Sequence, residues 1–293
     1  MSYLQAILMA VLQGVTELFP VSSLGHAVIV PAALTWPIDP RGPGFLPFLV
    51  ILHLGTATAL LIYFWQDWIH LLLALVGAGD RAARPAYLKL LKLLVIGTIP
   101  AALAGYFFNH ALRENFGAPG LAAMFLIVNG AMLFIGDRRH RLRAQRDGGE
   151  RGKPIADLTV TDAAIIGVVQ CAALLPGISR SGATIVAGLA RRLSSDAAAH
   201  FSFLLAAPII GGAGLLEVPK LVHAVHDGRL KPEFLTMSIV SGVVAGVAAY
   251  LSVAFLTRYF RATEIKMMRP FAIYCALAGA AALAWFILRP NGA

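Results

Sequence analysis

The chain has 293 residues, of which 58% are hydrophobic and only 13% are charged. A soluble domain of this length would carry about twice that share of charged residues. The composition therefore predicts an integral membrane protein with one helical core. The net charge of +9 comes from basic residues clustered in short loops, as the positive-inside rule expects. No aromatic interleaving or nucleic-acid module accompanies them, so we expect no nucleic-acid partner.

The first stretch of interest is a broken apolar segment at the N-terminus. An apolar run over residues 2–19 ends at Pro20, and a shorter apolar piece follows to Leu34. Neither piece crosses a bilayer comfortably alone. Gln13 and Glu17 are four residues apart and would share one face of a helix. Because a carboxylate within an apolar membrane segment is costly, Glu17 is expected to face a cavity or a partner rather than merely cap the following turn.

Six longer segments are predicted to span the membrane. They cover approximately residues 45–65, 90–108, 121–136, 201–222, 234–256 and 271–288. The segment between residues 137 and 153 is rich in arginine and is expected to be a mobile cytoplasmic loop. This orientation leaves both termini and the loop around Trp36 outside. We divide the chain into repeat one (1–137), a basic cytoplasmic loop (138–157) and repeat two (158–293).

A second broken segment opens the second half. The residues from 158 to 175 would enter from the cytoplasm, and the chain after Pro176-Gly177 would return to the same side as a re-entrant helical hairpin. Residues 13–30 resemble residues 170–186, since each has Gln, an apolar half-turn, Pro, a Ser-containing turn and then Gly. We therefore predict an all-α fold with an inverted-topology repeat, about six full spans and two re-entrant hairpins. The tips of the hairpins would meet near the midplane.

Arg180 is the only charged residue between Ala163 and Ala190. Its guanidinium can hold phosphate oxygens bidentately, and the nearby glycines leave backbone N–H groups free to form an anion nest at a helix N-terminus. The alternative is a structural ion pair with Glu17, which is compatible with a phosphate site. The candidate phosphate-binding residues are Ser22, Gly177, Ser179, Arg180, Ser181, Gly182 and Thr184.

The turn after Pro20 carries two hydroxyls and an imidazole within a few residues. Taken alone, Ser22-Ser23 is typical of a helix N-cap, and a single histidine is often packing. In combination with Glu17 and Arg180, we predict Ser23 as the nucleophile and His26 as its base. Direct attack by His26, or by water that His26 activates, stays open. The predicted catalytic residues are Glu17, Ser23, His26 and Arg180.

Three further features receive a structural interpretation. His53 lies in an apolar span, and a packing hydrogen bond is favoured over a place in a cavity. Asn129 is predicted to join helices. Gly242 and Gly246 form a GxxxG spacing that favours close internal packing over dimerisation. A homodimer is left open.

Two motifs carry a family resemblance. They are Gln13-Gly14-Val15-Thr16-Glu17 with Pro20-Val21-Ser22-Ser23-Leu24-Gly25-His26, and Pro176-Gly177-Ile178-Ser179-Arg180-Ser181-Gly182-Ala183-Thr184. Along essentially its whole length, the chain resembles the undecaprenyl-diphosphate phosphatases, also known as the bacitracin-resistance proteins. The resemblance implies a bacterial inner-membrane enzyme that hydrolyses the C55 isoprenyl diphosphate carrier to its monophosphate at the outer (periplasmic) face. This reaction recycles the carrier for cell-wall synthesis.

The resemblance also implies a divalent cation, Mg²⁺ or Ca²⁺. The first motif of the family has Glu or Gln, three residues, and then Glu. Here the pair is Gln13 and Glu17, so a cation would meet one carboxylate, and oxygens of the diphosphate would complete its shell. Whether Glu17 binds the metal or orients His26 stays open. The rival function is a transporter or flippase of the lipid carrier, because inverted repeats and broken helices suit that function too.

Overall fold

The computed structural model describes residues 1–40, 42, 44–108, 117–146, 148, 152–263 and 267–288. Within these residues the fold is all-α, apart from an isolated bridge between Lys153 and Leu193. The elements are α1 (Tyr3–Thr16), α2 (Ser23–Ala33), α3 (Phe45–Tyr63), α4 (Trp65–Val76), α5 (Arg84–Phe107), α7 (Pro119–Arg146), η1 (Ile155–Asp157), α8 (Val160–Gln170), η2 (Cys171–Leu174), α9 (Arg180–Ala190), α10 (Ser195–His226), α11 (Pro232–Ala262) and α12 (Arg269–Leu288).

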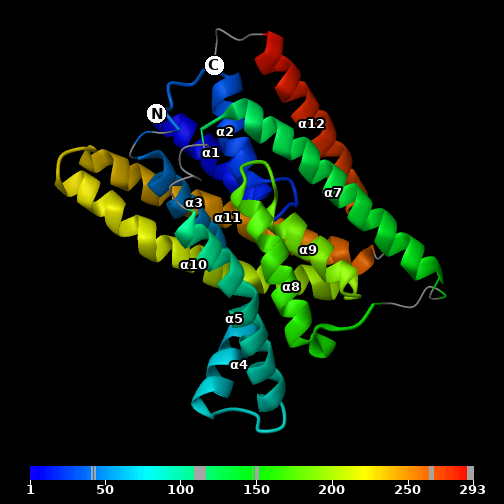
Figure 1. The fold of residues 1–293 in the computed structure, drawn as a ribbon. Helices are drawn as coiled ribbons and strands as arrows, with labels where there is room; N and C mark the ends of the chain where they lie inside the picture. Colours follow the sequence, from blue (N-terminus) through cyan, green and yellow to red (C-terminus); the bar gives the residue numbers. More distant parts are fainter. Residues whose placement is uncertain are drawn as a thin grey trace.

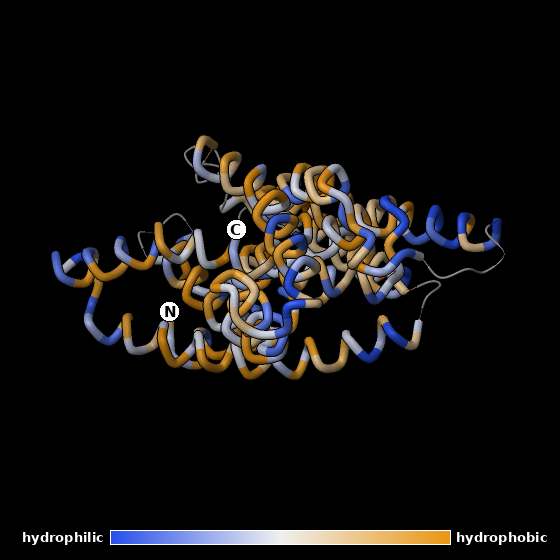
Figure 2. Tube along the Cα trace, turned by 90° about the horizontal axis from the view of Figure 1, so that it is seen from below, coloured by the Kyte–Doolittle hydropathy of each residue, from blue (hydrophilic) through white to orange (hydrophobic). Residues whose placement is uncertain are grey.

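Six described helices, α3, α5, α7, α10, α11 and α12, are long and apolar enough to cross a membrane. They coincide with the six predicted spans, which confirms that part of the prediction. Figure 1 shows α7 and α12 side by side along one edge, and these two helices pack together. Figure 2 shows hydrophobic residues along most of the helical trace and hydrophilic stretches toward its lateral ends.

The prediction of a mobile loop beginning at Asp137 is wrong for its first part, because α7 continues to Arg146. This segment is rich in Arg, which favours a helix, and it contains no Gly or Pro. Two contacts also hold it in place: Asp137 accepts a hydrogen bond from Met268 N at 3.1 Å, and Arg143 donates one to Leu189 O at 3.0 Å. Residues 147 and 149–151 lie outside the described part of the chain.

Helix α4 lies where no element was predicted. It follows α3 directly and packs against α5, and the two form the hairpin at the bottom of Figure 1. At 12 residues it is too short to span a bilayer. A search for long apolar segments therefore passes over it.

Two helix–break–helix units correspond to each other: α1 with α2, and α8 with α9. Helices α2 and α9 both have 11 residues, and each follows a serine N-cap. Ser22 Oγ accepts a hydrogen bond from Gly25 N at 3.2 Å, and Ser179 Oγ accepts one from Gly182 N at 3.1 Å. Helix α1 of the first half packs against α11 of the second half, and α8 of the second half packs against α5 of the first. Each helix–break–helix unit therefore packs against a long helix from the other half of the chain. This correspondence agrees with the predicted repeats, whose inversion stays a prediction.

Hydrogen bonds join the start of α8 to the end of α9. Asp162, in the first turn of α8, accepts hydrogen bonds at 2.6 Å from Lys153 Nζ and from Arg191 Nε, which follows α9. The start of α8 and the end of α9 therefore lie on the same side of the molecule. A re-entrant hairpin requires this arrangement.

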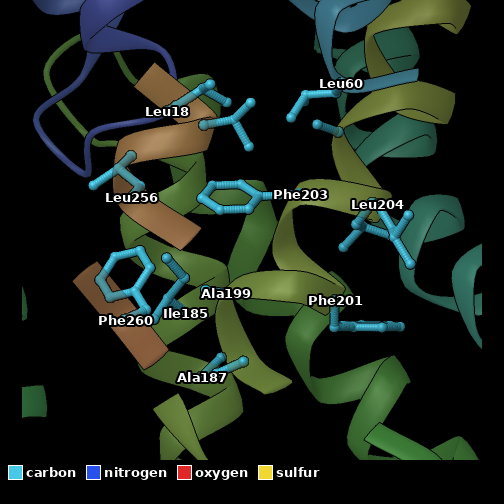
Figure 3. Close-up of a cluster of buried hydrophobic side chains, with 14 of the residues drawn as sticks. Leu18, Leu60, Ile185, Ala187, Ala199, Phe201, Phe203, Leu204, Leu256 and Phe260 are labelled. Atoms are coloured by element: carbon cyan, nitrogen blue, oxygen red, sulfur yellow. The ribbon is translucent and has the colours of Figure 1, made fainter. Parts of the chain in front are cut away.

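The packed core lies around α10. Figure 3 shows Phe203 of α10 surrounded by side chains from the other layers, among them Leu18, Ile185 and Leu256. All four side chains are at most 1% exposed. Close packing of this kind fixes α9 against α10. It thereby fixes the position of Arg180, which begins α9.

Candidate active site

The two broken segments touch at their glycines. A Cβ added to Gly25 would lie 2.9 Å from Gly177 Cα, and one added to Gly182 would lie 3.3 Å from Pro20 Cβ. Gly177 has φ +110°, which side-chain-bearing residues rarely adopt. Glycine at these positions therefore permits the two turns to approach each other closely, as we predicted for the tips of the two hairpins.

Asn129, which is 0% exposed, links both turns. Its Nδ2 donates to Pro20 O at 3.0 Å, and its Oδ1 accepts from Ser179 N at 3.0 Å. The predicted contact between helices is present, since Nδ2 of Asn129 in α7 lies 3.3 Å from Cys275 Sγ in α12, and Asn129 in addition joins the two broken segments. One side chain thus sets the spacing of the two halves of the site.

Replacing Asn129 with Leu is expected to destabilise the protein. The substitution keeps the approximate size but leaves the buried Pro20 carbonyl and Ser179 N–H unpaired, at about 1–3 kcal/mol for each group. Thermal unfolding in detergent should show a lower midpoint. Ser252→Ala is the matched control, since among the described residues Ser252 bonds only Ala248 O, within its own helix. Equal midpoints for Asn129→Leu and the wild type would contradict the bridging role.

A cavity of about 270 Å³ opens beside the joined turns. Its polar end includes Glu17, Ser23, His53, Gln170 and Arg180. The rest of its wall is apolar, with residues from α3, α5, η2 and α10: Leu46, Leu49, Val50, Ala101, Leu174, Ile209, Ile210 and Ala213. An apolar chamber with a few convergent polar groups is the usual form of a small-molecule site.

Glu17 is the centre of the polar end. Its Oε1 accepts from Arg180 Nη2 at 3.1 Å, and its Oε2 accepts from Ser23 Oγ at 2.6 Å and from Gln13 Nε2 at 3.2 Å. The predicted sharing of one helix face by Gln13 and Glu17 is confirmed. The carboxylate is 7% exposed, and such a buried charge is tolerable only when it is paired and hydrogen-bonded. The ion pair with Arg180 links the first broken segment to the second.

His53 belongs to this cavity, which we did not predict. Its Nδ1 makes the expected packing bond, to Leu49 O at 2.7 Å, but its Nε2 lies 3.3 Å from Glu17 Oε2. An ionisable residue inside an apolar span was the available signal. Gln170 was also missed as a site residue, although it is the counterpart of Gln13 in the second repeat. Its Oε1 is buried and has no hydrogen-bond partner in the described part of the chain.

His26 lies elsewhere. Its Nδ1 is 2.7 Å from Ser22 O, its Nε2 is 2.8 Å from the Tyr274 hydroxyl, and it is not among the described residues that line the cavity. The structure therefore does not bring together the predicted pair of Ser23 and His26. The Ser23 hydroxyl bonds to Glu17 instead.

The candidate phosphate-binding residues divide into two groups. Ser22, Ser179 and Arg180 line the cavity. The other four support it: Gly177 and Gly182 form the contact between turns, Ser181 Oγ donates to Glu17 O at 3.3 Å, and Thr184 Oγ1 lies 2.6 Å from Ser202 Oγ.

Arg180 is anchored by one nitrogen of its guanidinium and leaves another without a partner in the described structure. Its Nη1 donates to Ser202 O at 3.1 Å, whereas its buried Nε has no hydrogen-bond partner among the described residues. The hydrogen bond to Ser202 O anchors the guanidinium. Arg180 and Glu17 both line the cavity.

The residues at the polar end would supply only part of the coordination shell of a cation. The described residues contain no cluster of three or more His, Cys, Asp or Glu that could hold a metal by itself. Glu17 offers one carboxylate, and the buried Gln13 Oε1 is without a partner in the described structure. Mg²⁺ commonly binds one or two carboxylates together with substrate phosphates. Glu17 and Gln13 fit that habit.

Fold and site define a polytopic α-helical membrane protein with a buried carboxylate–guanidinium–hydroxyl site between two matching broken segments. The family model of the bacitracin resistance protein BacA matches residues 6–281. The chain therefore belongs to the BacA family.

Three curated relatives carry the name undecaprenyl-diphosphatase. The protein of Acidiphilium cryptum is 52% identical over 293 residues and covers 100% of both chains. That of Granulibacter bethesdensis is 49% identical over 97% of each chain. Undecaprenyl-diphosphatase 2 of Chromobacterium violaceum is 47% identical over 97% of this chain and 98% of its own. Together with the six apolar spans, the family indicates a multi-pass protein of the bacterial inner membrane.

Proposed function

We propose that the chain is an undecaprenyl-diphosphate phosphatase. It hydrolyses the isoprenyl diphosphate to the monophosphate and inorganic phosphate, which returns the lipid carrier to peptidoglycan synthesis and confers bacitracin resistance. The observation that carries this proposal is the convergence of Ser23 and Arg180 on Glu17 in an apolar-walled cavity. The names of the relatives support it.

The polar end of the cavity supplies the groups for phosphoryl transfer. Arg180 exchanges Glu17 for the terminal phosphoryl group and stabilises the charge that develops on it. Ser23 attacks phosphorus, and Glu17 Oε2, 2.6 Å from the hydroxyl, accepts its proton. The prenyl monophosphate leaves, and water then releases phosphate from Ser23. Glu17 takes the place of His26 as the base.

We propose that the cavity opens toward the outer face. Phe64, just after α3, stacks on His200 near the start of α10, with ring centroids 4.9 Å apart. This end of α3 lies on the side of the basic loops, which face the cytoplasm under the positive-inside rule. Leu46, which lines the cavity, is at the other end of α3. The isoprenyl tail would lie along this apolar wall.

A phosphate-release assay tests the function directly. It contains the purified protein in detergent, a short-chain prenyl diphosphate and a divalent cation, with no gradient. Release of phosphate identifies the enzyme. No release, together with movement of the lipid in vesicles, would identify the transporter instead.

Removal of divalent cations is expected to lower phosphate release at least about tenfold, because electrostatic stabilisation by a metal ion contributes several kcal/mol. Chelation followed by excess Mg²⁺ or Ca²⁺ should restore the rate. When bound, the cation would neutralise charge on the diphosphate. Gln13→Ala is expected to raise the cation concentration that gives half the maximal rate. Full activity under chelation would contradict the proposed metal requirement.

A further inference from the structure

His26 is held between two hydrogen bonds that fix its tautomer. Its Nδ1 is 2.7 Å from Ser22 O, and a carbonyl oxygen can only accept, so Nδ1 carries a proton. In the neutral ring Nε2 is then an acceptor, and the Tyr274 hydroxyl at 2.8 Å donates to it. The two rings also stack, with centroids 5.7 Å apart and planes 10° apart. Both ring nitrogens of His26 are therefore engaged away from Ser23.

The carbonyl that His26 holds belongs to a strained residue. Ser22 has φ 70° and ψ 92°, a conformation that residues other than glycine rarely adopt. Ser22 O accepts hydrogen bonds from His26 N at 3.2 Å and from the ring Nδ1. Such strain persists only where the surroundings determine it, and it is concentrated at functional sites. The His26 ring is part of what maintains it here.

Ser23 is the next residue, so the orientation of Ser22 decides where the Ser23 hydroxyl lies. That hydroxyl is 2.6 Å from Glu17 Oε2. A shift of about 1 Å in such a reacting group can cost about 100-fold in rate. The bonds to Ser22 therefore matter for the chemistry, although neither His26 nor Tyr274 is among the described residues that line the cavity.

Tyr274 comes from α12, near the other end of the chain. It is 46% exposed, so it does not serve mainly as core packing. The next residue is Cys275, and its Sγ lies 3.3 Å from Nδ2 of Asn129, the residue that joins the two turns. Helix α12 packs along α7, which carries Asn129 (Figure 1). The last helix of the chain thus reaches the first broken segment.

We propose that Tyr274 is a positioning residue for the phosphatase reaction. It acts through His26, whose ring aligns the Ser22–Ser23 turn and does not take the proton of Ser23. The proposal rests on the proposed function. It changes the role of His26 from base to support.

The first test is Tyr274→Phe, which keeps the stacked ring and removes only the donor. We expect kcat to fall about tenfold, a typical loss when a residue that orients a group of the active site through a hydrogen bond is removed. The KM for a prenyl diphosphate and the unfolding midpoint should stay unchanged. Tyr250→Phe is the matched control, because Tyr250 of α11 packs edge-on against Tyr63 of α3. This variant is expected to give wild-type rates. A wild-type kcat for Tyr274→Phe overturns the proposal.

The second test compares His26→Asn with His26→Ala. The amide of Asn can still donate to Ser22 O but cannot act as a base. We expect His26→Asn to be at least about tenfold more active than His26→Ala and to keep the acid limb of the kcat/KM pH profile. Equal inactivity of the two variants, or loss of that limb in His26→Asn, would restore the role of base to His26. Absence of phosphate release by the wild-type protein would instead reject the proposed function.

Discussion

Replacing Arg180 with Ala is expected to lower kcat for phosphate release at least about 100-fold, the typical loss for a preorganised electrostatic contact to the transition state. Arg180 lies at the N-terminus of α9, and its Nη1 is anchored on Ser202 O at 3.1 Å. The guanidinium is therefore preorganised. Steady-state release of phosphate from a short-chain prenyl diphosphate in detergent measures the effect.

Arg180→Lys separates charge from geometry. It keeps the positive charge and loses the planar fork, so a loss of at least about tenfold is expected. Arg229→Ala is the control, because Arg229 is exposed and pairs with the equally exposed Asp227. Its rate should match the wild type. Retention of more than about a tenth of the activity by Arg180→Ala would contradict the assigned role, provided the unfolding midpoint shows a folded protein.

Arg180 and Glu17 could be predicted from the sequence because each is an isolated charge in an apolar segment. Such a charge needs a partner or a cavity. The correspondence between the two broken segments further predicted that the charges would meet, although 163 positions separate them. The six spans could also be predicted, because the length and the hydropathy of a segment are enough to identify a spanning helix.

In the structure the ring of His26 bonds to partners other than Ser23. His26 follows Ser22 by four positions in α2, and residues four apart lie on one face of a helix. The ring therefore reaches back to the Ser22 carbonyl rather than to the Ser23 hydroxyl. Helical spacing also allows Ser23 and His26, three positions apart, to meet, so the choice of partner depends on the hydrogen bond of Tyr274 to the other ring nitrogen.

Tyr274 could not be predicted as a neighbour of the site, and for His53 the sequence left a place in the cavity as the less favoured alternative. Each lies on a long apolar helix, and its partner depends on how α3 and α12 pack against the first broken segment. The sequence pattern of one helix contains no information on that packing. The continuation of α7 to Arg146 was missed because dense charge suggested a loop, whereas helix propensity and the contact of Arg143 to Leu189 O favour a helix.

Ser23→Ala and Glu17→Gln are each expected to lower phosphate release at least about 100-fold. A hydroxyl 2.6 Å from a carboxylate forms a strong charge-assisted hydrogen bond, which aligns the proton for transfer. Ser23→Ala removes the nucleophile, and Glu17→Gln removes the acceptor while keeping the shape of the side chain. Ser238→Ala is the control, because in the described part of the chain the Ser238 hydroxyl bonds only Phe234 O, within α11.

Trapping the intermediate distinguishes the three nucleophiles that the sequence left open. With a prenyl diphosphate labelled on its terminal phosphate, a rapid acid quench should leave label on the peptide that contains Ser23, since a phosphoserine survives acid. The label should be absent from Ser23→Ala. A label that survives base and is lost in acid, mapped to His26, would show direct attack by the imidazole. No label, together with inversion of configuration at a stereolabelled terminal phosphorus, would show direct attack by water, because a covalent intermediate requires two displacements and gives retention. In either of those outcomes the hydrogen bond between Ser23 and Glu17 would serve to position the carboxylate, and Glu17 rather than Ser23 would be the group that the joined turns are built to hold.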